Sequence, residues 1–282
     1  MSRIAVVGSV NLDLVARVPR LPAPGETLAA AGLRRVPGGK GANQALAARR
    51  LGADVTLVAA VGDDPAAAEA LALLTRDGVR LDRLRHDADE PTGHALITVD
   101  DAGETTIVVV AGANATLSVA PEDVRGADAV LTVLEVPDAA VADAARHATG
   151  MVVLNAAPAR ALDPDLLRRV DLVVVNAGEY AAIDGLDAAR AVAVTHGAEG
   201  AVLRRGGREV ARAAPPPVTV VDGTAAGDAF TAALTVALLD GASDAAALHH
   251  ACAAGALAVT RPGAQPSLPT AAELEGAPCA RS

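Results

Sequence analysis

Short apolar runs alternate along this chain with alanine-rich segments of helical character. The apolar runs predict buried strands over residues 4–8, 55–61, 129–134, 151–154, 172–175 and 191–195. The segments between them predict helices over residues 41–50, 65–76 and 138–148, the first two each followed by a glycine that can end a helix. Strands alternating with helices are typical of a mostly parallel sheet covered by helices. We therefore expect an α/β fold.

Two polar or glycine-punctuated segments, residues 27–36 and 92–110, break this alternation. We expect them to form strands of a small separate sheet, a lid over the functional site. A hairpin over residues 202–210 predicts an edge of the main sheet. Beyond Asp222 the pattern predicts two long helices, 226–239 and 244–259. With no repeat or linker, residues 1–282 are expected to form a single domain into which the lid strands are inserted.

Composition excludes several classes of partner. The 282 residues carry 24 basic and 34 acidic side chains, a net charge of −10, which argues against nucleic acid. One Tyr, one Phe and no Trp leave little ring surface for stacking, so a sugar site must work through hydrogen bonds. Cys252 and Cys279 fit a reducing compartment. The first apolar run is too short for a signal peptide, and none reaches the ~18 residues of a membrane span. We expect a cytoplasmic protein with no membrane partner.

The most informative segment, Val221 to Phe230, reads Val-Asp-Gly-Thr-Ala-Ala-Gly-Asp-Ala-Phe. Its small residues Ala225, Ala226 and Gly227 open a predicted helix whose first turn carries Asp228. Free N–H groups and the positive end of the helix dipole make such a start an anion site. A lone Asp there is also simply favourable in a first helical turn. A carboxylate adds nothing to anion binding, however, whereas a phosphate site beside a base suits the phosphorylation of an alcohol.

A second glycine cluster, Gly38-Gly39-Lys40-Gly41-Ala42-Asn43-Gln44, also runs into a helix. It is not a P-loop, because glycine follows Lys40 where that motif needs Ser or Thr. A tight strand–helix turn would explain the two glycines alone. Lys40 and Asn43 nevertheless place a cation and an amide at a helix start, where they could hold the oxygens of a polyol.

Polar residues also follow predicted strands. Asn11 and Asp13 are two residues apart, so they point the same way in an extended chain and suit vicinal hydroxyls, although turn capping explains the pair equally well. Glu135 follows the strand 129–134, at the end where α/β folds present ligand groups. Asn176 and Glu179 begin a helix, and Glu179 by itself suggests a capping box. The six histidines have no spacing typical of zinc and are expected at the surface or in packing.

These motifs resemble those of the PfkB carbohydrate kinases, and within them the ribokinase branch, over nearly the whole chain. The glycine pair at 38–39 and the segment 222–228 match the two motifs that the family usually carries. The stretches at 8–13, 24–27, 154–160 and 261–267 resemble the ribokinase branch in particular. The resemblance implies a ribokinase-like three-layer sandwich with a central mostly parallel sheet and a small β-lid. The stretch between Glu179 and Thr195 is shorter than the helix plus strand usual there.

The resemblance also implies roles for individual residues. Asp228 would be the catalytic base, and the amides of Ala225, Ala226 and Gly227 would form an anion hole. The pentose would be held by Asn11, Asp13, Gly39, Lys40, Asn43, Glu135 and Asp228. ATP would lie along Asn176, Thr195, His196, Gly197, Ala198, Glu199, Gly200 and Gly227. Glu179 would place Mg²⁺ through water, and a monovalent cation, usually K⁺, would lie at Asp222, Thr224, Ala258, Arg261, Gly263 and Ser267.

The implied reaction is ATP-dependent phosphorylation of D-ribose at its 5-hydroxyl, giving ribose 5-phosphate and ADP, with Mg²⁺ and K⁺ as helpers. The lid strands would form a homodimer contact. Two alternatives stay open at this point. One is another activity of the family, with 2-deoxyribose, a ketohexose or a nucleoside as acceptor. The other is a catalytically silent sugar-binding sensor, against which the intact Asp228 segment argues.

Overall fold

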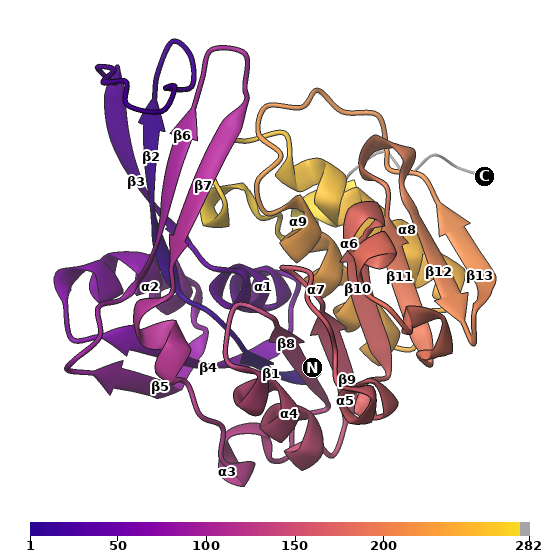
Figure 1. The fold of residues 1–282 in the computed structure, drawn as a ribbon. Helices are drawn as coiled ribbons and strands as arrows, with labels where there is room; N and C mark the ends of the chain where they lie inside the picture. The colour runs from indigo at the N-terminus through magenta and orange to yellow at the C-terminus, as the bar shows by residue number, and fades with distance from the viewer. Residues whose placement is uncertain (277–282) are drawn as a thin grey trace.

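The computed structural model describes residues 1–276, so Cys279 lies outside the described residues (Figure 1). The main sheet has nine strands in the order β13-β12-β11-β10-β9-β8-β1-β4-β5. Neighbours from β5 to β11 are parallel, and β12 and β13 pair antiparallel at one edge. The strands are β1 (Arg3–Val7), β4 (Asp54–Gly62), β5 (Arg80–Asp87), β8 (Ala129–Val133), β9 (Met151–Asn155), β10 (Leu172–Asn176), β11 (Ala191–Thr195), β12 (Ala201–Arg205) and β13 (Arg208–Ala213).

Helices cover both faces of this sheet and make it the middle of three layers (Figure 1). One face packs against α1 (Lys40–Arg50), α2 (Pro65–Asp77), α7 (Ala226–Leu239), α8 (Asp244–Ala258) and α9 (Ala271–Gly276). The other packs against α3 (Pro121–Val124), α4 (Asp138–His147), α5 (Pro164–Arg169) and α6 (Ala177–Ala182). On β1, Ile4 and Val6 enter the first core while Ala5 and Val7 enter the second. Burial on both faces explains why the strands are continuous apolar runs, and the predicted α/β sandwich is confirmed.

Four further strands form a separate sheet that projects from the body of the molecule, and we call this sheet the lid (Figure 1). Its order is β3 (Gly32–Gly38), β2 (Asn11–Arg17), β6 (Gly93–Val99) and β7 (Thr105–Val110). The predicted strand over 27–36 begins too early, and β2 was not predicted as part of the lid. The register explains the first error, because Arg17, the last residue of β2, already pairs with Gly32. Residues before Gly32 therefore have no strand of the lid to pair with.

One further strand differs from the sequence pattern. Strand β5 was not predicted, because its sequence Arg-Leu-Asp-Arg-Leu-Arg-His-Asp carries charges at an edge of the sheet, where one side faces solvent. The short stretch after Glu179 does accommodate strand β11, and a single 3₁₀ turn at Leu186–Ala188 takes up the remaining length. Among residues 1–276, the structure contains no helix with the length and apolarity to cross a membrane.

Candidate active site

Buried polar side chains gather where the lid joins the main sheet. Asn11 and Asp13 come from β2, Asn43 from α1 and Asp228 from the first turn of α7, and each is at most 8% exposed. Glu135 lies two residues beyond the end of β8. The carboxyl end of β8 and the N-terminal ends of α1 and α7 thus meet at this point. Strand ends and helix starts of this kind are where α/β folds hold ligands.

Glycines allow the start of helix α1 to lie close to the end of β1 and to β2. A Cβ on Gly41 would lie 2.5 Å from the nitrogen of Ser9, so helix α1 can begin against the end of β1 only without a side chain there. Gly39 has φ of 88°, a conformation that favours glycine, and its Cβ would lie 2.7 Å from the nitrogen of Asn11. A Cβ on Gly38 would lie 2.3 Å from Asp13 Oδ2. The glycine pair thus brings the start of α1 and the Asp13 carboxylate into one site.

Asp228 is held by two amides from α1. Asn43 Nδ2 donates to Asp228 Oδ2 and Gln44 Nε2 to Asp228 Oδ1, both at 2.8 Å. Burial raises the pKa of Asp228, while the charge of Lys40 and the two hydrogen bonds oppose that rise. A desolvated carboxylate beside an ammonium group, with a raised affinity for a proton, has the properties of a general base.

Three carboxylates and one ammonium share the site. Burial, followed by the charges of Glu135 and Asp228, raises the pKa of Asp13 from 3.8 to about 7. Burial lowers the pKa of Lys40, but the charges of Asp228, Glu135 and Glu179 outweigh it, so that the pKa of Lys40 lies above its ordinary value. The ammonium group of Lys40 therefore stays charged among the acidic groups. The carboxylates around it could accept hydrogen bonds from the hydroxyl groups of a ligand.

Hydrogen bonds from neighbouring residues fix Glu135 and Asn11. Glu135 Oε2 accepts from the Ser9 hydroxyl and, at 3.0 Å, from the backbone nitrogen of Lys40. Asn114 Nδ2 donates to Asn11 Oδ1 at 2.8 Å, and Asn114 Oδ1 accepts from the nitrogen of Val10 at 2.9 Å. This pairing leaves the Asn11 Nδ2 as the atom free to donate to a ligand.

The turn before α7 presents unused amides. Ala225, the N-cap residue, has φ of 61°, a left-handed conformation that costs an alanine about 1 kcal/mol. Within residues 1–276, the nitrogens of Ala225 and Gly227 donate no hydrogen bond, and that of Ala226 has only a contact of 3.5 Å to Gly223. Amides without a partner at a helix start are suited to an anion.

A cavity of about 560 Å³ lies on one side of this turn. Thr195, Gly197, Ala198, Gly200 and Gly227, which were predicted to lie along ATP, line it. The rest of its lining is Pro215, Pro216, Pro217, Val218, Val220, Gly223, Ala226, Phe230, Cys252, Gly255, Ala256 and Val259. Phe230, the one phenylalanine of the chain, is among these lining residues, so this cavity contains an aromatic ring.

Three residues predicted to lie along ATP are not in this lining. Asn176 forms a capping box with Glu179, in which each side chain bonds the other's backbone nitrogen at 2.8 Å. His196 and Glu199 flank the lining residues in the turn between β11 and β12, and their side chains are exposed. The structure thus brings together the small residues of this turn and leaves its two large polar side chains in solvent.

A second cavity, of about 680 Å³, lies between the lid and the turn. Asp13, Arg34 and Ile107 line it from the lid, and Asp222, Thr224 and Gly263 line it from the body. Gly223 lines both cavities, so the two meet at the amide turn. Asp228 lines neither cavity itself but directly follows Gly227, which lines the first.

The residues predicted for a monovalent cation fit a hard cation in their chemistry. Among the described residues, the carbonyl oxygens of Ala258, Arg261 and Gly263 accept no hydrogen bond. Asp222 supplies a carboxylate, although Thr224 and the nitrogen of Gly263 already donate to it. Burial raises the pKa of Asp222, but these hydrogen bonds and the charge of Arg34 outweigh it and lower that pKa. An ionised carboxylate with free carbonyls is a donor set of the kind that hard cations prefer.

Glu179 fits a role near a phosphate-bound Mg²⁺. Its charge acts on Lys40, which places it near the carboxylate cluster, and its side chain is exposed at the start of α6. Residues 1–276 contain no group of three or more His, Cys, Asp or Glu side chains arranged to hold a metal by themselves.

Four residues of the site escaped the sequence interpretation as functional residues: Ser9, Gln44, Asn114 and Asn155. Gln44 Nε2 also donates to Asn155 Oδ1 at 2.9 Å, and Asn155 Nδ2 donates to the carbonyl of Val174 at 3.1 Å. Gln44 and Ser9 lie within the motifs, next to residues that were singled out. Asn114 and Asn155 act on residues more than 100 positions away, which no local pattern reveals.

An α/β sandwich that places a buried base and an amide turn between two cavities defines a phosphotransferase. The sequence matches the pfkB family of carbohydrate kinases over residues 1–271. It is 36% identical over 291 residues to the ribokinase of Bacillus subtilis, covering 98% of this chain and 99% of that protein. It is also 36% identical over 298 residues to the bifunctional ribokinase/ribose-5-phosphate isomerase A of Fructilactobacillus sanfranciscensis, spanning 96% of this chain and 55% of that protein.

Among solved structures, the Arabidopsis thaliana ribokinase complexed with ribose and ATP is similar with a TM-score of 0.89 and 31% identity, over 98% of both chains. The chain belongs to the pfkB family of carbohydrate kinases.

Proposed function

We propose that this protein phosphorylates D-ribose at its 5-hydroxyl with ATP, giving ribose 5-phosphate and ADP. The observation that carries the proposal is the position of the turn from Gly223 to Asp228, where the two cavities meet. The first cavity, on the side of Thr195 and Phe230, suits a nucleotide base. The second, beneath the lid, suits a sugar because Asp13, Arg34 and Asp222 bring charged groups to its lining. The near-full-length similarity to ribokinases supports ribose as the acceptor.

Asp228 acts as the general base. Its carboxylate accepts the proton of the 5-hydroxyl while the hydroxyl oxygen attacks the γ-phosphorus of ATP and the bond to the bridging oxygen of ADP breaks. Asn43 and Gln44 hold both carboxylate oxygens, so the base is oriented before the substrate arrives. Asp13 and Glu135 accept hydrogen bonds from the other sugar hydroxyls, and Asn11 donates through its free Nδ2.

The amides of Ala225, Ala226 and Gly227 stabilise the negative charge that develops on the transferred phosphoryl group. These amides are fixed by the turn and need no reorganisation when the charge appears. Lys40 contributes a half-buried positive charge near the base. When bound, Mg²⁺ would neutralise phosphate charge, held through water by Glu179. The carboxylate of Asp222 and the carbonyls near it would hold K⁺ next to the turn.

The lid also supports a homodimer. Ile97, Val99 and Ile107 line the sugar cavity, so the alternation of a strand places Leu96, Val108 and Val110 on the opposite face. These three side chains are 43–60% exposed, and Leu96 and Val108 are directly paired. An exposed apolar face on a small sheet suits a second copy of the same face. We place the enzyme in the cytoplasm, where ATP is available to it.

ADP release from ATP and Mg²⁺ tests the proposal, with ribose, 2-deoxyribose, fructose and adenosine as acceptors, each with and without K⁺. We expect the highest kcat/KM with ribose and a stimulation by K⁺. A higher kcat/KM with another acceptor would show that this acceptor, and not ribose, is the preferred substrate. Ribose binding without turnover on any acceptor would indicate a sensor instead. Sedimentation of the wild type and of Val108→Asp tests the dimer, and a wild-type monomer would refute it.

A further inference from the structure

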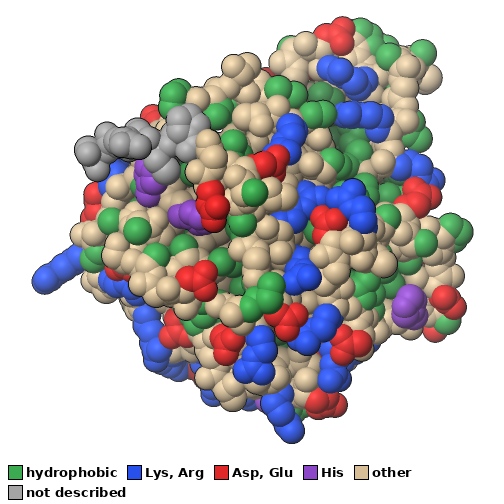
Figure 2. Space-filling view, turned by 180° about the vertical axis from the view of Figure 1, so that it is seen from behind, with side chains coloured by type: hydrophobic (Ala, Val, Ile, Leu, Met, Phe, Trp, Pro, Cys, Tyr) green, Lys and Arg blue, Asp and Glu red, His purple; other side chains and the backbone are tan. Residues whose placement is uncertain are grey.

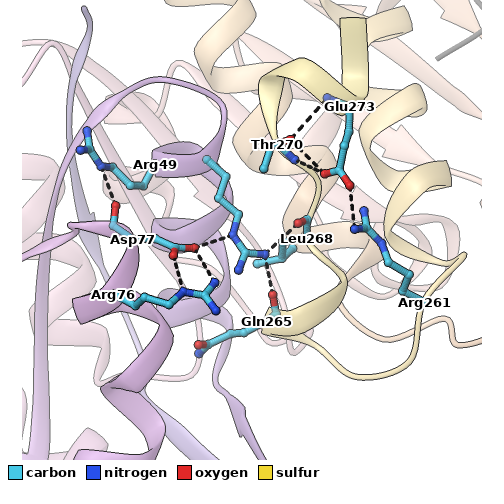
Figure 3. A network of polar contacts seen from close by, with 9 residues as sticks. Arg49, Arg76, Asp77, Arg261, Gln265, Leu268, Thr270 and Glu273 are labelled. Carbon is cyan, nitrogen blue, oxygen red and sulfur yellow. Dashed lines mark hydrogen bonds and ion pairs between the residues drawn. The ribbon is translucent and has the colours of Figure 1, made fainter. Parts of the chain in front are cut away.

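Arg50, in the last turn of α1, connects that helix to the segment following α8. Its Nε donates to Asp77 Oδ2 at 2.8 Å, and its Nη1 donates to the carbonyl oxygens of Gln265 and Leu268, both at 2.8 Å. The Arg50 side chain is only 9% exposed. Figure 3 shows the network in which Asp77, Gln265 and Leu268 take part. A planar guanidinium held by one carboxylate and two carbonyls has a fixed position.

The polar groups around Arg50 are paired with one another. Figure 2 shows basic and acidic side chains interspersed on the back of the molecule. A groove of about 830 Å³ is lined by Arg49, Arg50, Arg76 and Arg261, and Asp77 also pairs with Arg76 at 2.7 Å. Arg261 pairs with Glu273 at 2.8 Å. The arginines thus join protein segments to one another, and the role of Arg50 follows from the segment that it holds.

Val259, directly after α8, accepts from the nitrogens of Val221 and Asp222, and residues 263–268 reach the amide turn through one further hydrogen bond. The nitrogen of Gly263 donates to Asp222 Oδ2 at 2.8 Å. Asp222 Oδ1 in turn accepts from the nitrogen of Thr224 at 2.9 Å and from its hydroxyl at 2.6 Å. Thr224 directly precedes Ala225, whose left-handed conformation persists only if its surroundings impose it. The carbonyls held by Arg50 therefore lie at the start of a short chain of contacts that ends at the turn.

We infer that Arg50, fixed by Asp77, is a positioning residue for phosphoryl transfer. It holds residues 263–268 so that Asp222 and Thr224 keep the amide turn in its productive shape. The other end of α1 carries Lys40, Asn43 and Gln44, so this one helix orients the base directly and the amide turn through Arg50. The kinetic part of the inference rests on the proposed function.

Arg49 provides a matched control. It precedes Arg50 in the same helical turn and lines the same groove. Its guanidinium donates to the carbonyls of Asp77 and Ala53, at 3.0 and 3.2 Å. Neither carbonyl belongs to residues 263–268. Arg49→Lys therefore removes guanidinium hydrogen bonds near Arg50 without changing the contacts of that segment.

The kinetic test compares Arg50→Lys, Arg49→Lys and the wild type with ribose, ATP and K⁺. Lysine keeps the charge but lacks the planar fork. We expect kcat of Arg50→Lys to fall about tenfold or more, because displacement of catalytic groups by a fraction of an ångström is costly. Its KM for ribose should change less than about twofold, since the sugar contacts lie at the other end of α1, and Arg49→Lys should keep both constants within about twofold.

Amide hydrogen exchange over residues 222–227 supplies a readout that needs no turnover. We expect faster exchange there in Arg50→Lys but not in Arg49→Lys. If the wild type does not phosphorylate ribose and exchange still responds to Arg50→Lys alone, the proposed substrate is wrong and the positioning of the turn stands. If the wild type phosphorylates ribose and the two variants match in kcat and exchange, the role of Arg50 is wrong. Changed exchange with wild-type kcat would also refute a role in phosphoryl transfer.

Discussion

The side chain of Gln44 lies between Asp228 and Asn155, with its Nε2 2.8 Å from Asp228 Oδ1 and 2.9 Å from Asn155 Oδ1. One buried amide thus joins the base on α7 to the end of β9. Both protons of the Gln44 amide are used, so this side chain has a single orientation. The contact fixes where Asp228 can accept a proton and also influences whether it is ionised.

Gln44→Met should shift the pH dependence of the reaction. Burial raises the pKa of Asp228, and the hydrogen bond from Gln44 is among the contacts that oppose it. Methionine fills a similar volume without an N–H, so the pKa of Asp228 should rise further. We expect the acidic limb of the kcat/KM profile to move to higher pH. An unshifted limb in a variant of wild-type thermal stability would contradict the role of Gln44.

Asp228→Asn should remove the catalytic base and leave ribose binding intact. We expect kcat to fall by about 10²- to 10⁴-fold, the usual contribution of a general base. Ribose binding measured by calorimetry should remain. Asp244→Asn is the matched control, because Asp244 also lies in the first turn of a long helix but pairs with Arg205 on the surface. Wild-type turnover in Asp228→Asn would refute the assigned role.

Asp13→Asn should stabilise the protein in a pH-dependent manner. Burial, with the charges of Glu135 and Asp228, raises the pKa of Asp13 from 3.8 to about 7. Between these pH values the folded protein retains a proton that the unfolded chain releases, so the contribution of Asp13 to stability falls as the pH rises. Thermal denaturation should therefore show a larger gain in Tm for Asp13→Asn at pH 8 than at pH 5. Equal gains in Tm at both pH values would show that ionised Asp13 does not destabilise the folded protein.

Gly38→Ala should disturb the sugar site through Asp13. The new Cβ would lie 2.3 Å from Asp13 Oδ2, so the carboxylate must move. We expect kcat/KM for ribose to fall about tenfold or more while KM for ATP changes little. Gly32→Ala is the control at the other end of β3, since its Cβ would meet no atom within 4 Å. Equal effects of the two substitutions would show that the contact with Asp13 is irrelevant.

Local patterns determined much of this protein. The predicted helix over 226–239 has the observed bounds, with Asp228 in its first turn, because a small-residue turn and an alanine-rich segment define a helix start locally. The apolar runs located the central strands because a sheet buried on both faces needs continuous apolar sequence. The charged strand β5 and the lid strand β2 lacked that signal, since their partners rather than their own sequences make them strands.

The sequence by itself thus determined the sandwich, the amide turn and the residue types of the chemistry. Only the tertiary structure decided how those residues act on one another. Asn43 and Gln44 bond Asp228 across separations of 185 and 184 residues, and Arg50 reaches Gln265 across 215. The raised pKa of Asp13 likewise comes from burial beside Glu135 and Asp228. Hydrogen bonding and desolvation depend on distances in space, and the order of the strands and the packing of α1 against α7 set those distances.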